Sequence, residues 1–229
     1  MKLTHWLLAG LMASTSLYAN SAAAQEVGMR YSTLFSKLKQ NVKEGHDDVK
    51  IAFFLLDQRD GSVCDVHKGW MQKDEHYEAL VIPESNELDI PVDNNLRQAN
   101  PDVTFVIDDG ITCDVSMQVI ARDHFESSLS HADVARLVPQ MQVMLSDLGG
   151  MFSDWFMPSV EGVVVHLAPQ RTASGTLSSA QPTLIQLTNG TQVTVTDNKA
   201  VLKLADLTAE ETVPFPSSIV KVTPWLPRN

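Results

Sequence analysis

A repeated seven-residue motif constrains the fold more than any other feature of this sequence. Asp60–Val66 (DGSVCDV) recurs 49 residues later as Asp109–Val115 (DGITCDV), and each copy carries one of the two cysteines of the chain. An Asp-Gly pair between apolar runs is typical of a tight β turn, because such turns need residues that tolerate positive φ. Each copy is therefore predicted to be a hairpin, with the second strand beginning near the cysteine.

The strands of these two hairpins can be placed from their composition. Val49–Leu56 and Val103–Ile107 are β-rich runs that precede the two turns. In the second copy, alternate residues share one face of the strand, and this face is predicted to point inward. Its members are Cys113, Val115, Met117, Val119 and Ala121.

Residues 1–24 have the composition of a secretory signal peptide. Lys2 gives a positive start, residues 6–13 form an apolar run, and three alanines precede Gln25. The run is too short to span a bilayer, which takes about 20 residues, and no cysteine near the cleavage site offers a thiol for acylation. We therefore expect cleavage near Ala24-Gln25 and a soluble periplasmic protein of a Gram-negative cell, with no transmembrane segment and no lipid anchor.

Export changes the interpretation of Cys64 and Cys113. In an oxidising compartment two cysteines are more often bridged than free. A bond between them would close a loop worth about 4 kcal/mol in the chain-entropy model. The repeat has only two copies, so chance convergence of turn residues is the alternative explanation, but we predict the disulfide.

Other segments give helix and strand signals around the two motifs. A helix is predicted over residues 30–42 from apolar spacing of i, i+3, i+4 and i+7. Short strands are predicted at Tyr77–Ile82 and Leu88–Val92, followed by a helical turn or loop at Asn94–Asn100. The spacing of the strands between residues 46 and 122 is typical of an antiparallel sandwich or partly open barrel.

An amphipathic helix is predicted over residues 130–148. Ser130 and Asp133 resemble a capping box, with Asp in place of the usual Glu or Gln. Apolar residues then recur at helical spacing until Gly149-Gly150. Pro139 lies inside this pattern and is expected to kink the helix or divide it in two.

The C-terminal part is predicted to form a small β tail. Strands are predicted at Leu184–Leu187 and Val193–Val195 around an Asn189-Gly190 turn, with others at Ala200–Leu204 and Ile219–Val222 after Val163–Leu167. Residues 169–182 lack large apolar side chains and are the candidate linker or long loop. The expected organisation is thus a main β-rich domain at 25–168, the linker, and a β subdomain at 183–229 that docks on the main domain because it is too small for a core of its own.

Composition excludes several functions. The chain has 28 acidic and 17 basic residues and a formal net charge of −11. Binding to nucleic acid requires clustered Lys and Arg, so no nucleic-acid partner is expected. Two cysteines cannot build a four-thiolate zinc site, and no glycine-rich phosphate loop is present. We expect no cofactor.

Motifs for metal binding and catalysis are also missing. None of the histidines forms a His-x-His or His-Glu-x-x-His pattern. His46 beside Asp47-Asp48, or His67 and His76 near Asp74-Glu75, could converge in space, but solvated loop residues are the better explanation. There is no Gly-x-Ser-x-Gly motif. The sequence therefore assigns no metal ligand and no catalytic residue.

One apolar segment is a candidate for binding a partner. It combines large, adaptable side chains: Met151, Phe152, Trp155, Phe156 and Met157. A helical turn that completes the core is the favoured alternative, and contact with a membrane surface ranks third because no Lys or Arg flanks the segment.

Three short motifs resemble an uncharacterised family of exported Gram-negative proteins, a domain of unknown function. They are Lys68–Met71 (KGWM), Leu148–Pro158 (LGGMFSDWFMP) and Thr223–Leu226 (TPWL). The resemblance implies export and a shared fold over most of the chain, and it carries no catalytic residues.

Together these features predict an α+β, β-rich protein that is exported and non-catalytic. The expected function is binding, or interaction with an unknown protein or envelope component. The alternative is a periplasmic hydrolase that uses Asp and His residues assembled by the fold.

Overall fold

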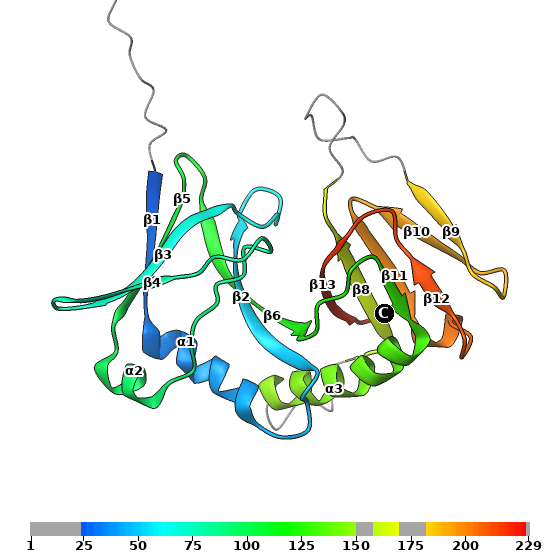
Figure 1. Ribbon diagram of the computed structural model, residues 1–229, viewed down its shortest axis with the longest axis horizontal. Helices are drawn as coiled ribbons and strands as arrows, with labels where there is room; N and C mark the ends of the chain where they lie inside the picture. The colour runs from blue at the N-terminus through cyan, green and yellow to red at the C-terminus, as the bar shows by residue number, and fades with distance from the viewer. Residues whose placement is uncertain (1–23, 150–157, 170–181, 228–229) are drawn as a thin grey trace, which may run out of the picture.

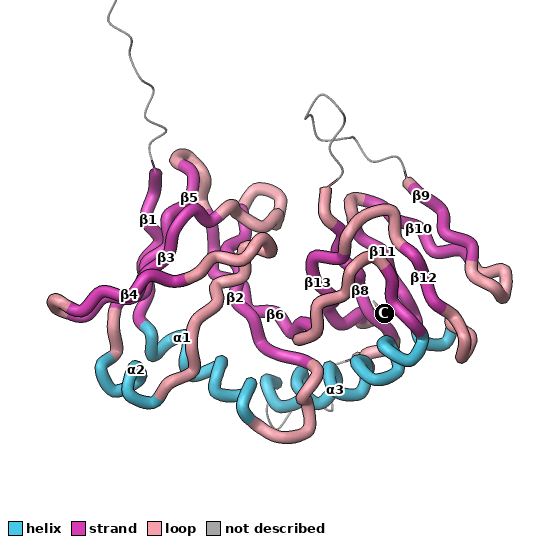
Figure 2. Tube along the Cα trace, viewed as in Figure 1, coloured by secondary structure: helices cyan, strands magenta, loops and turns pink. Residues whose placement is uncertain are grey.

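The computed structural model describes residues 24–149, 158–169 and 182–227. Two β-sheet halves lie side by side, and one long helix runs beneath both of them (Figure 1). Figure 2 shows the helices gathered on this side and the strands above them. The α+β, β-rich class is confirmed, with antiparallel sheets, an N-terminal helix and a C-terminal sheet; no sheet in the described ranges closes into a barrel.

The first half contains a four-stranded antiparallel sheet in the order β1-β5-β3-β4. Its strands are β1 Ala24–Arg30, β3 Val66–Lys73, β4 His76–Leu80 and β5 Asp102–Asp108. The predicted N-terminal helix is confirmed as α1 Tyr31–Leu38, which continues as a 3-10 turn, Lys39–Val42, and buries Tyr31, Leu34 and Leu38. The stretch after residue 93 is helical, α2 Asn94–Ala99.

The two predicted hairpins are confirmed only in part. The first motif folds back on the preceding strand through a single antiparallel bridge, Leu56 with Val63, and the second motif forms no such pairing among the described residues. Both turns have a glycine with positive φ, Gly61 at 71° and Gly110 at 75°. However, β2 Val49–Asp57 pairs with β6 Cys113–Ala121, while β3 pairs with β5. The strands on either side of each turn therefore belong to different ladders, and the two copies exchange partners. A turn fixes the local reversal of the chain but not the partner of each strand.

Two other sequence predictions in this region are corrected. Leu88–Val92 is not a strand; Leu88 and Ile90 are buried, and the Leu88 N–H donates to the Phe53 carbonyl at 2.8 Å. Their apolar character reflects packing rather than sheet pairing. Val115 and Met117 are 43% and 38% exposed, although their register partners Leu55 and Phe53 are buried, so the core covers this face at β2 but leaves the neighbouring part of β6 open to solvent.

The disulfide is present and joins the two ladders. Cys64 and Cys113 are bonded, with their Cα atoms 6.7 Å apart. Cys113 is the first residue of β6, and Cys64 precedes β3, where its N–H donates to the Leu55 carbonyl of β2. The disulfide therefore links the β2–β6 ladder covalently to the segment that leads into β3, next to both motif turns.

The second half is a five-stranded antiparallel sheet in the order β13-β8-β11-β10-β9. Its strands are β8 Gly162–Leu167, β9 Thr183–Gln186, β10 Gln192–Thr196, β11 Lys199–Lys203 and β13 Ile219–Trp225. The predicted turn at Asn189-Gly190 does connect two paired strands, β9 and β10. β8 precedes the candidate linker, yet it pairs with β11 and β13, which follow it. A 3-10 turn, Leu204–Asp206, and a small ladder of β7 Ser128–Ser130 with β12 Thr212–Pro214 complete this half.

The long helix α3 spans His131–Gly149. Its capping box is confirmed, since the Ser130 hydroxyl accepts from the Asp133 N–H at 3.1 Å and the Asp133 carboxylate accepts from the Ser130 N–H at 3.0 Å. Pro139 lies inside this single helix, so the alternative of two separate helices is wrong. Packing explains why the helix continues, because its buried face, which includes Leu137, Met141 and Met144, lies against the strands of both halves.

Candidate functional site

A hollow of about 440 Å³ lies where the two halves meet. One wall is the start of β13, the other is the end of β6 with the residues that follow it, and a loop at residues 83–87 closes a side. Apolar side chains make up much of its lining, among them Pro83, Ile120, Phe125, Ile219 and Val222. A concave, partly apolar site between two structural units is a common place for a small ligand.

An ion pair stands in the wall of this hollow. The Lys50 ammonium lies 2.7 Å from a Glu87 carboxylate oxygen, and the two side chains are only 24% and 13% exposed. Lys50 comes from β2 and Glu87 from the loop after β4. Because each charge has its partner, neither needs a ligand for compensation.

Lys221 also lines the hollow, but its cation has a different environment. Its ammonium donates to the Gln118 side-chain carbonyl at 2.8 Å and lies 3.9 Å from the centre of the Phe54 ring. Neither partner carries a negative charge. Burial, followed by the nearby charge of Lys199, lowers the pKa of Lys221 to about 8, although Glu87 acts in the opposite direction.

Lys221 belongs to a row of three basic residues that crosses the C-terminal sheet. Lys199 on β11 and Lys221 on β13 are both the register partners of His166 on β8. Directly opposed residues of an antiparallel ladder lie on the same face, so the three side chains share one face. Burial, with the charges of Lys221 and then Lys199, lowers the pKa of His166 to about 3. The ring is therefore neutral at pH 7, and its Nε2 lies 3.0 Å from the Thr223 hydroxyl.

The sheet that carries this row contains no acidic residue in any of its five strands. This is unusual for a chain with 28 Asp and Glu residues. Lys203 adds a further cation to the same face, where it lies 5.1 Å from the centre of the Trp225 ring. The face is therefore locally basic within an acidic protein.

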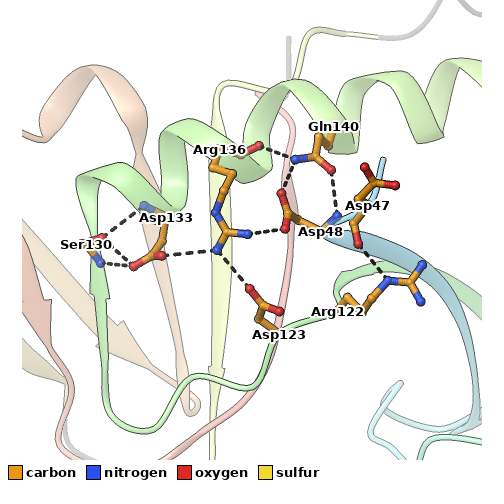
Figure 3. Close-up of polar contacts among 8 residues, drawn as sticks. All are labelled: Asp47, Asp48, Arg122, Asp123, Ser130, Asp133, Arg136 and Gln140. Carbon is orange, nitrogen blue, oxygen red and sulfur yellow. Dashed lines mark hydrogen bonds and ion pairs between the residues drawn. The ribbon is translucent and has the colours of Figure 1, made fainter. Parts of the chain in front are cut away.

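A polar network below the hollow fixes α3 to the first half (Figure 3). Arg136 forms ion pairs with Asp48, with Asp123 at 3.1 Å and with Asp133 at 3.5 Å. Asp48 also accepts from the Gln140 amide, and Gln140 accepts from the Asp48 N–H at 2.8 Å. Asp123 lines the hollow as well. One guanidinium thus pairs with three carboxylates at the base of the candidate site, and the cluster keeps a net negative charge.

The depressed pKa of His166 predicts how stability depends on pH. A histidine whose pKa falls on folding binds its proton more readily in the unfolded chain, so stability is lost as the pH falls below 6.5 toward 3. Between pH 7 and pH 5 we expect a loss of about 2 kcal/mol from this group. Urea unfolding of wild type and His166→Gln at both pH values measures it. The variant should lose less by about that amount, and equal losses would contradict the assignment.

The histidines considered for a metal site are dispersed. His67 is exposed and its Nε2 forms a hydrogen bond with the Asp108 carboxylate at 2.7 Å, and His76 is exposed on β4. His46 is fully buried without a hydrogen-bond partner for either ring nitrogen. The Asp47 backbone carbonyl accepts from Arg122 at 2.9 Å, and the Asp48 carboxylate pairs with Arg136 (Figure 3). His131 begins α3. No group of three or more potential ligands occurs in the part of the chain that the structure describes.

The hollow contains the residue types of a hydrolase but not their arrangement. His124, Asp123, Ser85 and Ser218 all line it. Among the described residues, no hydrogen bond joins His124 to any of the other three, and Asp123 is paired with Arg136. Nucleophilic catalysis requires a base within hydrogen-bond reach of the nucleophile. The described residues of the lining therefore hold no preassembled pair of nucleophile and base.

The candidate partner segment predicted from the sequence, Met151–Met157, lies outside the described residues. The basic row was not predicted. Its members are far apart in the sequence, and only the register of β8, β11 and β13 brings them together. One feature of the sequence could have indicated the row: the strands predicted in the C-terminal part contain no Asp or Glu.

A second hollow, of about 450 Å³, lies beside the edge strand β4 and the helix α2. Met71, Leu96, Ala99 and Pro101 are among its lining residues. It has no cluster of like charges comparable to the basic row. We therefore take the first hollow and the adjoining basic face as the candidate functional site.

Comparison with known proteins identifies a family but no activity. A family model described as protein of unknown function (DUF2987) matches residues 23–167. The match includes both cysteines and His166, but it ends before Lys199 and Lys221. Of the motifs that suggested a family, Lys68–Met71 and Leu148–Pro158 lie inside the matched range and Thr223–Leu226 lies outside it. No curated protein and no solved structure matches the chain.

Proposed function

The chain belongs to the DUF2987 family, and from that premise we propose that it is an exported, non-catalytic protein that binds a small ligand in the hollow between its two halves. The observation that carries this proposal is the hollow itself. It has room for a small molecule, an apolar lining and half-buried cations, and it lacks a hydrogen-bonded nucleophile and base among the described residues. Those are properties of a binding site.

The fold supports a ligand site at this position. Lys221 from β13 donates to Gln118 on β6, so a residue at the hollow also connects the halves. The Arg136 network and α3 hold the halves together from below. A ligand in the hollow would therefore contact both halves against a braced base.

Export to a Gram-negative periplasm is part of the proposal. It rests on the leader-like residues 1–24 and is consistent with a disulfide, since such bonds persist in oxidising compartments. No helix in the described residues is long and apolar enough to cross a membrane. N-terminal sequencing of the protein from a periplasmic extract should begin near Gln25, and an intact Met1 in the cytosolic fraction would contradict this part.

An envelope component is the proposed source of the ligand. The apolar segment Met151–Met157 remains a candidate contact with a partner, and its role is a prediction from sequence composition.

A plugging variant tests the binding function. Ser218 is exposed and lines the hollow, and its backbone carbonyl rather than its side chain bonds to Ala168. In Ser218→Trp the indole should fill the hollow without disturbing the strands. Ser36→Trp, at an exposed position on α1, is the matched control.

Mass spectrometry under non-denaturing conditions is the measurement. Protein purified from the producing cell should carry a small-molecule adduct in the wild type and in Ser36→Trp. Ser218→Trp should lose it. If both variants retain the adduct equally, the ligand binds outside the hollow and the proposed binding site is wrong.

A further inference from the structure

We propose that Lys199 and Lys221, with His166 between them, form a binding site for a phosphate group of the ligand held in the adjoining hollow. This inference rests on the proposed binding function and specifies the chemistry of the ligand. The site is continuous with the hollow because Lys221 belongs to both.

The strand register makes the site possible. Lys199 and Lys221 are both partners of His166, so they flank it on the two neighbouring strands. Neighbouring strands are about 4.8 Å apart, which places the two lysine backbones about 10 Å from one another. Their long side chains can converge on one anion over His166. Their charges already act on a common place, since both lower the pKa of His166.

Lys221 lacks the compensation that a half-buried cation normally has. Its two contacts, Gln118 and Phe54, are neutral. Glu87 is the one acidic group whose charge acts on Lys221, and it is already paired with Lys50 at 2.7 Å. Lys199 has no ion pair with a carboxylate in the described part of the chain. Buried charges are costly unless they are paired, so an anion would supply for the half-buried Lys221 what the protein does not. Lys199 is exposed on β11, and its part in the site rests on its position beside His166.

The surrounding charge favours a local site for a multiply charged anion. None of the five strands carries Asp or Glu, whereas the whole chain has a net charge of −11. At physiological salt, exposed charges more than about 8 Å apart are largely screened, so the acidity of the chain as a whole does not prevent a local anion site. The acidic residues near the site are Asp197 in the turn before Lys199 and Glu87, which pairs with Lys50. Each ammonium offers up to three donors, and phosphate has enough oxygens to accept from both in charge-assisted hydrogen bonds.

Lys203 provides a matched control. It lies on the same strand and face as Lys199, but its register partner is Gly162 rather than His166. Its ammonium lies over the Trp225 ring, 5.1 Å from the centre. Lys199→Gln and Lys203→Gln therefore remove the same charge from the same sheet, and only Lys199→Gln removes it from the proposed site.

The first test is calorimetric titration of the full, disulfide-bonded chain with inorganic phosphate at constant ionic strength. We expect saturable binding by the wild type, at least tenfold weaker binding by Lys199→Gln, and a change of less than twofold in Lys203→Gln. Absence of binding by the wild type would overturn the proposal. Equal weakening by both variants would also overturn it, because it would indicate a diffuse effect of charge.

Lys221 needs a variant that preserves folding, because its side chain connects the two halves. Lys221→Arg keeps the charge and should bind phosphate within a few-fold of the wild type. Lys221→Gln should lose at least tenfold, with folding checked by its circular dichroism spectrum. If Lys221→Gln does not fold, Lys199→Gln decides the outcome alone. Wild-type affinity in a folded Lys221→Gln would overturn the role of this residue.

The phosphate could belong to a soluble molecule or to a lipid headgroup, and vesicles distinguish these sources. Co-sedimentation with phosphatidylglycerol and phosphatidylcholine vesicles, but not with phosphatidylcholine alone, would identify a headgroup if Lys199→Gln abolishes it. Phosphate binding without co-sedimentation would identify a soluble ligand. A co-purifying adduct that Ser218→Trp loses but Lys199→Gln retains in full would overturn the phosphate site and leave the binding function standing.

Discussion

Replacing Cys64 and Cys113 with alanine is expected to lower the free energy of unfolding by about 4 kcal/mol. The bond closes a loop of 49 residues, and in the chain-entropy model a loop of this length restricts the unfolded chain by about that amount. The loop contains β3, β4 and β5, three of the four strands of the first sheet. Without the bond, residues 64 and 113 can move apart in the unfolded chain, which raises the conformational entropy of the unfolded state.

Urea unfolding followed by circular dichroism measures this loss. Wild-type protein in reducing agent is the control, and it should lose about as much stability as the double variant. A loss below about 1 kcal/mol in both would contradict the account, because it would mean that the exchange of strands is held by packing and hydrogen bonds alone.

Gly162→Ala is expected to cost about 3 kcal/mol, although it adds only one methyl group. A Cβ at this position would lie 2.2 Å from the Leu202 carbonyl oxygen and 2.8 Å from the Lys203 Cα. Both are backbone atoms of β11, so a side-chain rotation cannot relieve the overlap. Because β8 also pairs with β13, the strand cannot move away without breaking a second ladder.

Gly28→Ala is the matched control for this prediction. Gly28 also lies in a strand, β1, but a Cβ there would have no atom within 4 Å. Its unfolding free energy should stay within about 0.5 kcal/mol of the wild type or rise slightly, since alanine restricts the unfolded chain. Thermal unfolding of both variants provides the comparison. Similar melting temperatures for Gly162→Ala and wild type would show that β11 is not packed against β8 as described.

The sequence predicted most local structure correctly for identifiable physical reasons. The capping box at Ser130 and Asp133, the turn at Asn189-Gly190 and the disulfide all depend on residue types with strong local or pairwise preferences. The exchange of strands between the two motifs was not predictable in this way. The choice of β6 rather than β3 as the partner of β2 depends on long-range packing, which no turn motif encodes.

The candidate site also depends on long-range strand pairing, so no local sequence motif predicts it. Lys199 and Lys221 are ordinary lysines in the sequence, and His166 has no metal-binding or catalytic motif around it. Their relationship exists only in the register of three strands, two of which lie beyond the family match. The ion pair between Lys50 and Glu87 likewise joins residues that are far apart in the sequence, so the sequence alone does not predict it.

A crystal structure of the full chain at a phosphate concentration well above its measured dissociation constant would test the central claim most directly. The account predicts one phosphate bound beside the hollow, with oxygens within about 2.7–3.2 Å of the ammonium nitrogens of both Lys199 and Lys221. Phosphate bound elsewhere, or a vacant row with Lys221 still donating to Gln118 as it does here, would contradict it.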